Sequence, residues 1–385
     1  MAKIKLVHTA DLHLGAPLTV FGDYAETRQQ DFWDTFDRIV KLSASWGADF
    51  LLLAGDLFNS NQVTPALAAR VGRAFEELHD QGVTAVVIPG THDHLQGQQS
   101  VYRRFPFEPA VVLDQPEVME PVPAPVRGEE VYLYGFAYQH GRSEQALASM
   151  KRRDMPGFHI GLLHCSVVQS PTWQPEPKDL PLSERDLFDL ELDYLALGHY
   201  HNYHEFNQQG MVRACYPGSP EGTCFDEKGD RYVALVELDA DLVTVRPQTV
   251  NSKLVKERAF DLTGMDTGRE IAQLLTEEAD AQVILRAILR GCLEGPVDKN
   301  FLLASLEGQF AHLEICDDET TLYEPFILEK LRKEKSVRGF FIDRILARME
   351  GSANPDLRQQ CQQAIKEVLA RFAGITGNVD KRGRA

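Results

Sequence analysis

Five short apolar runs that end in aspartate or histidine constrain the fold of this chain more than any other feature. Leucine-rich or β-branched runs are typical of buried parallel strands, and the carboxyl ends of parallel strands meet at one edge of a sheet. We therefore expect the polar residues after the runs to converge there. The runs with their polar ends are Leu6-Val7-His8-Thr9-Ala10-Asp11-Leu12-His13, Leu51-Leu52-Leu53-Ala54-Gly55-Asp56, Val86-Val87-Ile88-Pro89-Gly90-Thr91-His92-Asp93-His94, Ile160-Gly161-Leu162-Leu163-His164 and Tyr194-Leu195-Ala196-Leu197-Gly198-His199-Tyr200-His201.

Residues 1–250 first alternate strand and helix and then change to strand, turn, strand. Helical spacing of apolar residues predicts helices over 25–46 and 64–81, the second with Thr64 as its cap and Pro65 in its first turn. This order predicts an α/β fold with two sheets face to face and helices outside, a four-layer α/β/β/α sandwich. The strands expected besides those of the first three runs are 131–137, 158–165, 193–198, 211–216, 231–238 and 242–249.

The remaining 135 residues of this 385-residue chain predict two further parts, since the chain is too long for one ordinary core. Residues 251–320 read as a small α+β unit, with strands at 259–262, 282–291 and 311–316 and helices at 269–279 and 300–310. Residues 321–385 carry two apolar helical stripes separated by Gly351–Pro355, and we expect a helix hairpin. The expected domains are therefore 1–250, 251–320 and 321–385.

The net charge of −17 argues against a general nucleic-acid coat, although residues 330–348 form a locally basic helix. Six cysteines without a CxxC pair indicate reduced thiols, as in a cytoplasmic protein. We expect no signal peptide and no membrane span, because no apolar stretch approaches the roughly 20 residues that a span needs.

The polar strand ends carry a mixed set of carboxylates and imidazoles, which suits Mn²⁺, Fe or Zn²⁺ better than Mg²⁺ alone. Asp56 stands alone after its glycine and is the candidate to bridge two ions. Two divalent ions about 3.5–4 Å apart suit in-line attack on a phosphate, and a nearby imidazole can protonate the leaving oxygen. The candidate site residues are Asp11, His13, Asp56, His92, Asp93, His164, His199 and His201.

In their order along the chain, the motifs Asp-x-His, Gly-Asp, Gly-x-His-Asp, a strand-end His and Gly-His-x-His resemble those of calcineurin-like metallophosphoesterases. Within that family, His8–Gly15 and Gly55–Phe58 look most like SbcD-type DNA repair nucleases of the YhaO sub-branch. The runs Tyr216–Pro220 and Phe225–Glu227 are also similar to that branch. The resemblance covers 1–250 strongly and reaches 251–320 only by architecture, as a capping domain.

The resemblance implies a role for each candidate. One metal would be held by Asp11, His13, Asp56 and His201, and the other by Asp56, His164, His199 and the residue before the catalytic histidine. That catalytic residue is His92. The residue before it is normally Asn in the family, and here it is Thr91. Thr91 can ligate directly, act through a water or only hold the loop, and Asp93 can support the site or merely the loop.

Three functions stay open on the sequence alone. The first is a Mn²⁺-preferring phosphodiesterase acting on DNA ends, a 3′→5′ exonuclease with some endonuclease action. The second is a phosphoesterase of the same superfamily for small substrates such as cyclic nucleotides. The third, motivated by Thr91, is a scaffold with weakened catalysis. For partners the resemblance implies an SbcC-like coiled-coil ATPase, gripped by residues 325–373, and homodimerisation through helices 25–46 and 64–81.

Overall fold

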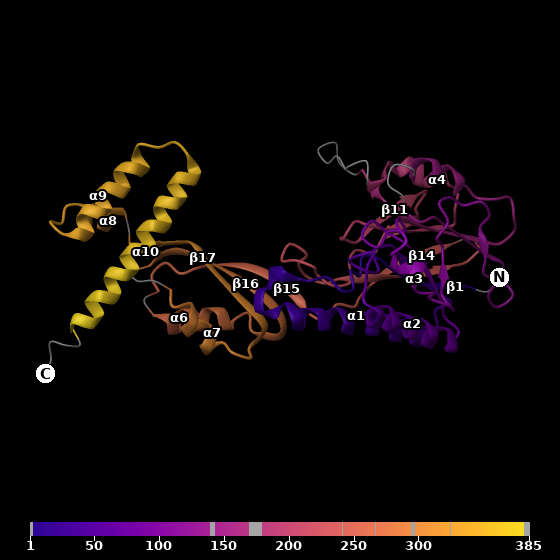
Figure 1. Ribbon diagram of the computed structural model, residues 1–385, viewed down its shortest axis with the longest axis horizontal. Coiled ribbons are helices and arrows are strands. Elements are labelled where there is room, and N and C mark those ends of the chain that lie inside the picture. The colour runs from indigo at the N-terminus through magenta and orange to yellow at the C-terminus, as the bar shows by residue number, and fades with distance from the viewer. Residues whose placement is uncertain are drawn as a thin grey trace. The chain divides into compact units, whose positions relative to one another are not determined.

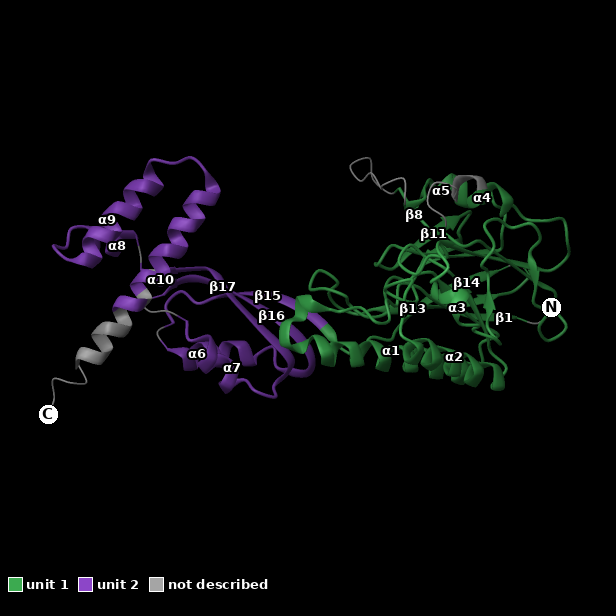
Figure 2. Cartoon of the chain, viewed as in Figure 1, with its two compact units in different colours: residues 1–254 green, residues 255–385 purple. Residues whose placement is uncertain are grey.

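The computed structural model describes residues 3–138, 143–168, 179–240, 242–265, 267–293, 297–323 and 325–380. The chain divides into two compact units, residues 1–254 and 255–385 (Figure 2). Among the described residues, no helix is both long and apolar enough to cross a membrane.

The first unit contains two six-stranded mixed sheets. In one sheet the order is β14-β13-β1-β2-β3-β4, where β1, β2, β3 and β4 run parallel and β13 lies antiparallel to β1. In the other the order is β11-β12-β10-β7-β6-β5, with β6, β7, β10 and β12 parallel. The bounds are β1 Ile4–Thr9, β2 Phe50–Ala54, β3 Thr84–Ile88, β4 Val111–Val112, β13 Tyr232–Leu238 and β14 Val243–Thr249 for the first sheet, and β5 Val122–Pro123, β6 Val131–Gly135, β7 Phe158–His164, β10 Tyr194–Gly198, β11 His204–Gln208 and β12 Met211–Tyr216 for the second.

One hydrophobic cluster joins the inner faces of these two sheets. It takes Leu6 and Leu52 from the first sheet and Ile160 and Leu162 from the second, all with no exposed surface. Truncating such a residue to alanine costs about 2–5 kcal/mol, because the cavity it leaves does not fully close. The shared core fixes the strand ends of both sheets relative to one another, which is the condition for a site built from both.

Two long helices and several short elements complete the first unit. Helix α1 (Ala25–Trp46) buries the apolar stripe that its sequence predicted, and α2 (Pro65–Asp80) begins at the predicted cap, where the Thr64 hydroxyl accepts a hydrogen bond from the Leu67 amide at 3.3 Å. The short elements are η1 Thr19–Tyr24, α3 Val101–Arg104, α4 Ser143–Ser149, β8 Ser166–Val167, β9 Pro181–Leu182 and α5 Glu184–Phe188.

The second unit has a three-stranded sheet, two short helices and three C-terminal helices (Figure 1). The sheet order is β15-β16-β17, and β16 and β17 run parallel. The bounds are β15 Leu254–Asp261, α6 Gly268–Thr276, β16 Asp280–Leu293, α7 Lys299–Ser305, β17 Phe310–Leu322, α8 Pro325–Arg332, α9 Val337–Glu350 and α10 Pro355–Asp380.

The α/β class with two mixed sheets and C-terminal helices agrees with the sequence-based expectation, but three local predictions were wrong. The helix predicted over 300–310 ends at Ser305, and Phe310 begins a strand. The C-terminal region contains the two expected helices on either side of Gly351–Pro355, α9 and α10, and a further helix, α8, before them. The expected basic helix 330–348 is divided between α8 and α9, because Ser336 caps α9 by accepting from the Gly339 amide at 3.0 Å. Strand β11 was not predicted, since its sequence is mostly polar.

Candidate metal centre

Four of the candidate residues follow their strands in a backbone conformation that L-residues rarely adopt. The φ angles are +53° at Asp11, +45° at His13, +50° at Asp56 and +97° at His199. Each such residue costs on the order of 1–3 kcal/mol and persists only where its surroundings hold it. The Asp11 amide donates to the Gly55 carbonyl at 3.1 Å, and the His13 amide donates to the Asp56 carbonyl at 3.0 Å. These hydrogen bonds join the segments that follow β1 and β2, and each segment holds the other in its left-handed backbone conformation.

Glycines allow the strand ends to approach closely. A Cβ at Gly90 would lie 2.3 Å from Asp56 Oδ1, and a Cβ at Gly198 would lie 1.9 Å from the Ala54 carbonyl oxygen. Neither distance is tolerable for a real side chain. The glycines that precede Thr91 and His199 are thus required by the packing of the site.

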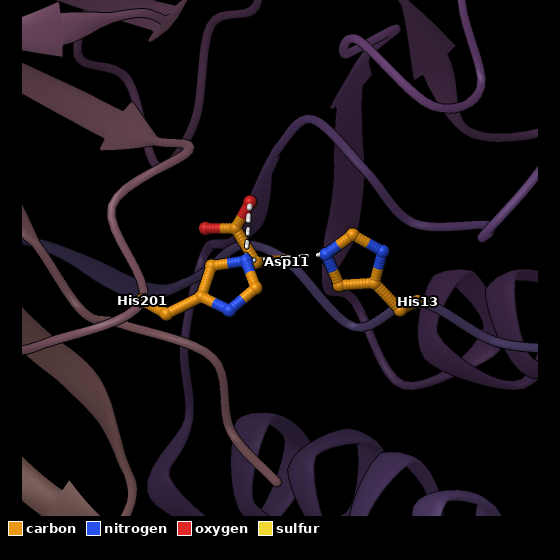
Figure 3. A group of neighbouring side chains, drawn as sticks. All are labelled: Asp11, His13 and His201. Atoms are coloured by element: carbon orange, nitrogen blue, oxygen red, sulfur yellow. Dashed lines mark hydrogen bonds and ion pairs between the residues drawn. The ribbon is translucent and has the colours of Figure 1, made fainter. Parts of the chain in front are cut away.

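Asp11, His13 and His201 form the first group of side chains that could hold a cation (Figure 3). One potential ligand atom from each lies within 4.8 Å of the others. His13 Nε2 and His201 Nε2 are 3.3 Å apart, and His201 Nε2 is 4.0 Å from Asp11 Oδ1. Asp11 is fully buried, and its carboxylate accepts from the His199 amide at 3.0 Å. Two imidazole nitrogens that face each other beside a buried carboxylate are a donor set that suits a divalent cation such as Mn²⁺, Fe or Zn²⁺.

Asp56, His164 and His199 form the second group. His164 Nε2 lies 3.3 Å from Asp56 Oδ2, while its Nδ1–H donates to the Ala54 carbonyl at 2.9 Å. That backbone contact fixes the ring so that Nε2 faces Asp56. Asp56 also groups with His13 and His92. Asp56 is therefore the carboxylate common to both sides of the site, as expected of a bridging ligand.

Thr91 and His92 reach the site from the loop after β3. The Thr91 hydroxyl lies 3.2 Å from Asp56 Oδ2 and 3.4 Å from His164 Nε2, so it belongs to the second group. The His92 amide donates to Asp56 Oδ1 at 2.8 Å, and its exposed ring lies edge-on to His13 with centroids 4.8 Å apart. His92 Nδ1 is 3.3 Å from the Asn59 carbonyl oxygen. A donating Nδ1–H there leaves Nε2 free to face a ligand.

Asp93 supports the loop through hydrogen bonds of its carboxylate. Its buried carboxylate accepts from the Gly90 amide at 2.7 Å, the Phe58 amide at 3.1 Å and the Tyr102 hydroxyl at 2.7 Å. Burial and the nearby Asp56 charge raise the pKa of Asp93 to about 6. We therefore describe Asp93 as the residue that shapes the Gly90–Asp93 turn.

Burial and charge divide the histidines into two kinds. Burial lowers the pKa of His13 to about 4 and that of His199 to about 3, which keeps both rings neutral near pH 7. Burial also opposes charge on His164, but the Asp56 carboxylate outweighs it and raises the pKa of His164 to about 10. The pKa of His201 is raised as well, because Glu227 offsets the desolvation. A cation that enters the site would displace the protons that His164 and His201 hold.

Two acidic residues join the site although the sequence did not single them out for it. His201 Nδ1 contacts Glu227 Oε1, and Glu227 Oε2 accepts from the Thr223 amide at 2.6 Å. His199 Nε2 lies 3.6 Å from Asp179 Oδ1. Glu227 stands in the run Phe225–Glu227 that carried part of the resemblance, but nothing in that run indicates contact with His201. His8 is buried and packs inward, with its Nδ1 2.9 Å from the Tyr194 hydroxyl.

Comparisons with known proteins agree with the resemblance read from the motifs. The model of the family described as calcineurin-like phosphoesterase matches residues 4–203. The chain is 26% identical to the "uncharacterized metallophosphoesterase YhaO" of Bacillus subtilis, over 76% of this chain and 72% of that one. It is 25% identical to the "DNA double-strand break repair protein Mre11" of Sulfurisphaera tokodaii, over 80% and 78% of the two chains. It is 26% identical to the Mre11 of Saccharolobus solfataricus, over 97% and 99%.

Proposed function

This chain belongs to the calcineurin-like phosphoesterase family, and we propose that it is a two-metal phosphodiesterase that hydrolyses DNA at strand ends. The observation that carries the proposal is the convergence of two Asp–His groups on the shared carboxylate of Asp56. We propose that Asp11, His13, Asp56 and His201 hold one ion, and that Asp56, His164 and His199 hold the other, with Thr91 beside it. Mn²⁺ is the proposed metal, with Fe, Zn²⁺ and Mg²⁺ as alternatives.

Two bound ions would orient the phosphate, lower the pKa of an attacking water and neutralise the charge that builds on the phosphoryl oxygens. The chain itself supplies the remaining chemistry. His92 groups with His13 and Asp56 but has an exposed ring, and its contact with the Asn59 carbonyl leaves Nε2 free. We assign His92 the transfer of a proton to the leaving oxygen.

DNA as the substrate is supported by relatives and by architecture. The Mre11 relatives are named for DNA double-strand break repair, and one of them aligns with nearly the whole chain, including the second unit. We propose that residues 251–320 act as a capping domain for a polymer substrate, that the first unit is a four-layer α/β/β/α sandwich, and that cleavage proceeds 3′→5′. The limits 1–250, 251–320 and 321–385 remain our proposed functional division.

The direct test is Mn²⁺-dependent digestion of end-labelled duplex DNA by the purified full chain. His92→Asn is expected to lower the rate about 10²–10⁴-fold, the usual contribution of a positioned proton donor, while two ions stay bound. Equal cleavage by both proteins would overturn the role of His92. Turnover of a small phosphodiester without any DNA cleavage would favour the small-substrate alternative.

We also propose that the C-terminal helices bind an SbcC-like coiled-coil ATPase. Helices α8 and α9 expose Phe326 (57%), Val337 (76%) and Phe340 (62%), flanked by Lys330 and Arg344, whose charges lie over the Phe326 and Phe340 rings. Exposed large apolar side chains rimmed by charge are typical of a protein interface. Phe340→Glu should abolish co-purification with the ATPase, whereas Phe301→Glu on α7, exposed by 39%, should not. Retained binding by Phe340→Glu would refute this surface.

Homodimerisation through α1 and α2 is a further proposal from the resemblance. The two helices are joined by the Arg70 guanidinium, which lies 3.9 Å from the Trp33 ring centroid and 3.0 Å from Asp37. Sedimentation of the full chain tests it, and a monomer at micromolar concentration would contradict it.

A further inference from the structure

A cluster of buried charged side chains lies between helix α1 and the loop of residues 218–227, which ends with Glu227. Arg28 and Asp31 come from α1, Glu221 comes from the loop, and all three are buried. Arg28 Nη1 lies 2.7 Å from Glu221 Oε1 and 3.2 Å from Asp31 Oδ2. None of the three belongs to the candidate ligand groups, so the metal centre alone does not account for their burial.

Glu221 joins three segments that are far apart in the sequence. Its Oε2 accepts from the Thr35 hydroxyl of α1 at 2.5 Å and from the Ser252 amide at 2.7 Å. The Ser252 hydroxyl donates to the same oxygen at 3.1 Å. Ser252 stands just before Val255, where the second unit begins. One buried carboxylate therefore holds α1, the loop and the segment that leads into the second unit.

Two arginines connect the segment of residues 250–253 to the same region. Arg38 Nη1 of α1 donates to the Asn251 carbonyl at 2.6 Å. The Arg231 amide donates to Asn251 Oδ1 at 3.0 Å, and the Arg231 guanidinium contacts the His201 carbonyl. The segment thus has a second connection, independent of Glu221, to the backbone of a candidate ligand.

The path from Glu221 to the imidazole of His201 is short. Thr223, two residues after Glu221, donates its amide to Glu227 Oε2 at 2.6 Å, and the intervening carbonyl accepts from Arg28 Nη2 at 2.7 Å. Glu227 Oε1 contacts His201 Nδ1. A carboxylate behind an imidazole orients the ring and raises its basicity toward a metal. A shift of Glu221 would move the Thr223 amide, and with it the carboxylate that orients His201.

Stability alone is a weak reason for a buried cluster of this kind. Desolvation offsets most of the attraction in a buried ion pair, and apolar residues of similar volume often stabilise a protein as well. Geometry is what the charges add, because the oxygens of Glu221 meet all their donors in one arrangement of the three segments only. Loss of a partner is costly, since it leaves a buried charge unpaired.

Building on the proposed two-metal function, we propose that Glu221 is a positioning residue for the ion at the first ligand group, and that the segment 250–253 is linked to this ion through Glu221. Linkage between two sites is reciprocal. Displacement of the segment lowers the affinity for the first ion, and binding of the first ion stabilises the segment. The connection to the second unit is thereby a means of regulating the metal centre.

A pair of substitutions tests the positioning role by isothermal titration of the full chain with Mn²⁺. Glu221→Gln should weaken one of the two binding steps roughly 2–30-fold, the range for residues that act through a network. The same step should be the one that Glu227→Gln weakens. The variant carrying both changes should lose no more affinity than Glu227→Gln alone, because Glu221 acts through Glu227. Additive losses, weakening of both steps or no weakening would overturn the role.

Two further variants keep this test decisive. Asp49→Asn removes another buried carboxylate, which accepts from the Lys5 amide at 2.8 Å at the start of β2, the opposite end of that strand from Asp56. It should change neither binding step. Thr35→Val leaves the Glu221 charge in place and removes one donor, so it tests the same step if Glu221→Gln does not fold. An unchanged first step in Thr35→Val would contradict the positioning role.

Hydrogen exchange on the unsubstituted chain tests the reciprocal effect. Mn²⁺ at a concentration that fills the first ion should slow exchange of the Ser252 amide by a similar factor, roughly 2–30-fold. The Lys5 amide, which is also bound to a buried carboxylate, should exchange at an unchanged rate. No effect of Mn²⁺ at Ser252 would overturn the linkage, and so would equal slowing at both amides, which general stabilisation produces.

Neither measurement depends on DNA hydrolysis. Linkage in a chain that cleaves no DNA would reject the proposed function alone. Mn²⁺-dependent cleavage without linkage would reject the role of Glu221 alone, and a chain that binds no Mn²⁺ would reject both.

Discussion

The two halves of the candidate metal centre differ in what stands behind their histidines. In the first half, His201 is backed by the carboxylate of Glu227, which is itself held by the Thr223 amide. In the second half, His164 is backed by the neutral carbonyl of Ala54, and His199 Nε2 lies 3.6 Å from Asp179 Oδ1, farther than His201 is from Glu227. The Thr91 hydroxyl lies beside Asp56 in this half. A carboxylate behind an imidazole raises its basicity toward a metal more than a carbonyl does. We therefore expect the first half to bind its ion more tightly.

Removing the shared carboxylate should have the largest effect on this comparison. Asp56→Asn is expected to weaken both ions and to reduce activity by more than the roughly 100-fold that loss of an outer partner costs. Asp11→Asn, as a matched variant, removes a carboxylate that groups with His13 and His201 and meets the second group only through the His199 amide. Metal content after dialysis, measured by plasma spectrometry, distinguishes the two. If Asp56→Asn retained as many ions as Asp11→Asn, Asp56 would not be the bridge.

Removing the Glu227 carboxylate, which supports His201 in the first half, should have the next largest effect on metal binding. Glu227→Gln is expected to weaken the tighter ion about 10–100-fold, because the amide leaves the His201 ring less basic. The weaker ion should be unaffected. Asp226→Asn removes the same charge from an exposed neighbour and is the control. Isothermal titration with Mn²⁺ measures the binding of both ions. If only the weaker binding step changed, Glu227 would support the weaker ion, contrary to our assignment.

The stability of the metal-free chain and its affinity for metal should change with pH in opposite directions. In the metal-free chain the pKa of His164 is raised from 6.5 to about 10, chiefly by Asp56 acting against desolvation. Its stabilising contribution is fully present below pH 6.5 and is lost as the pH rises through about 10. Urea unfolding should therefore show the metal-free chain losing stability between pH 7 and 10. Metal binding in that range should release protons and strengthen with pH by up to about tenfold per unit for each proton released.

A metal-free chain whose stability did not fall over this range would contradict the charged His164–Asp56 pair. Buffers of different ionisation enthalpy provide the independent check, since proton release then appears in the measured heat of Mn²⁺ binding.

The smallest expected effect is at Thr91. An Asn carbonyl is a better ligand for a hard cation than a neutral hydroxyl, so Thr91→Asn should strengthen the second ion by less than about tenfold. Thr91→Val keeps the shape of the side chain but removes its oxygen, and it should weaken binding of the second ion. If both variants bound the second ion like the native chain, Thr91 would serve only to hold the loop.

Much of the fold was predictable because the signals were local. Buried strands such as β2 and β3 are continuous apolar runs, and α2 has its cap and proline in sequence. The convergence of Asp56, His164 and His199 followed from the rule that parallel strand ends share an edge. The gathering of these side chains was thus accessible from sequence, and their role as ligands remains our proposal.

The parts that were not predictable depend on contacts between distant residues. Glu227 meets His201 only because the Gly218 turn brings its loop back across the His201 carbonyl, where a Cβ at Gly218 would lie 2.6 Å from that oxygen. The left-handed backbone at Asp11, His13, Asp56 and His199 was not predicted, because Asp and His adopt it more often than most residues but still rarely, and no local motif marks these positions. The division between α8 and α9 rests on one serine cap inside a stretch of good helix formers.

The most direct test of the paired centre is anomalous diffraction at the manganese edge, on crystals of the full chain soaked at increasing Mn²⁺ concentration. We expect two peaks on either side of the Asp56 carboxylate, with the peak among Asp11, His13 and His201 filling first. A single peak at every concentration, or two peaks of which the one beside Thr91 fills first, would contradict it.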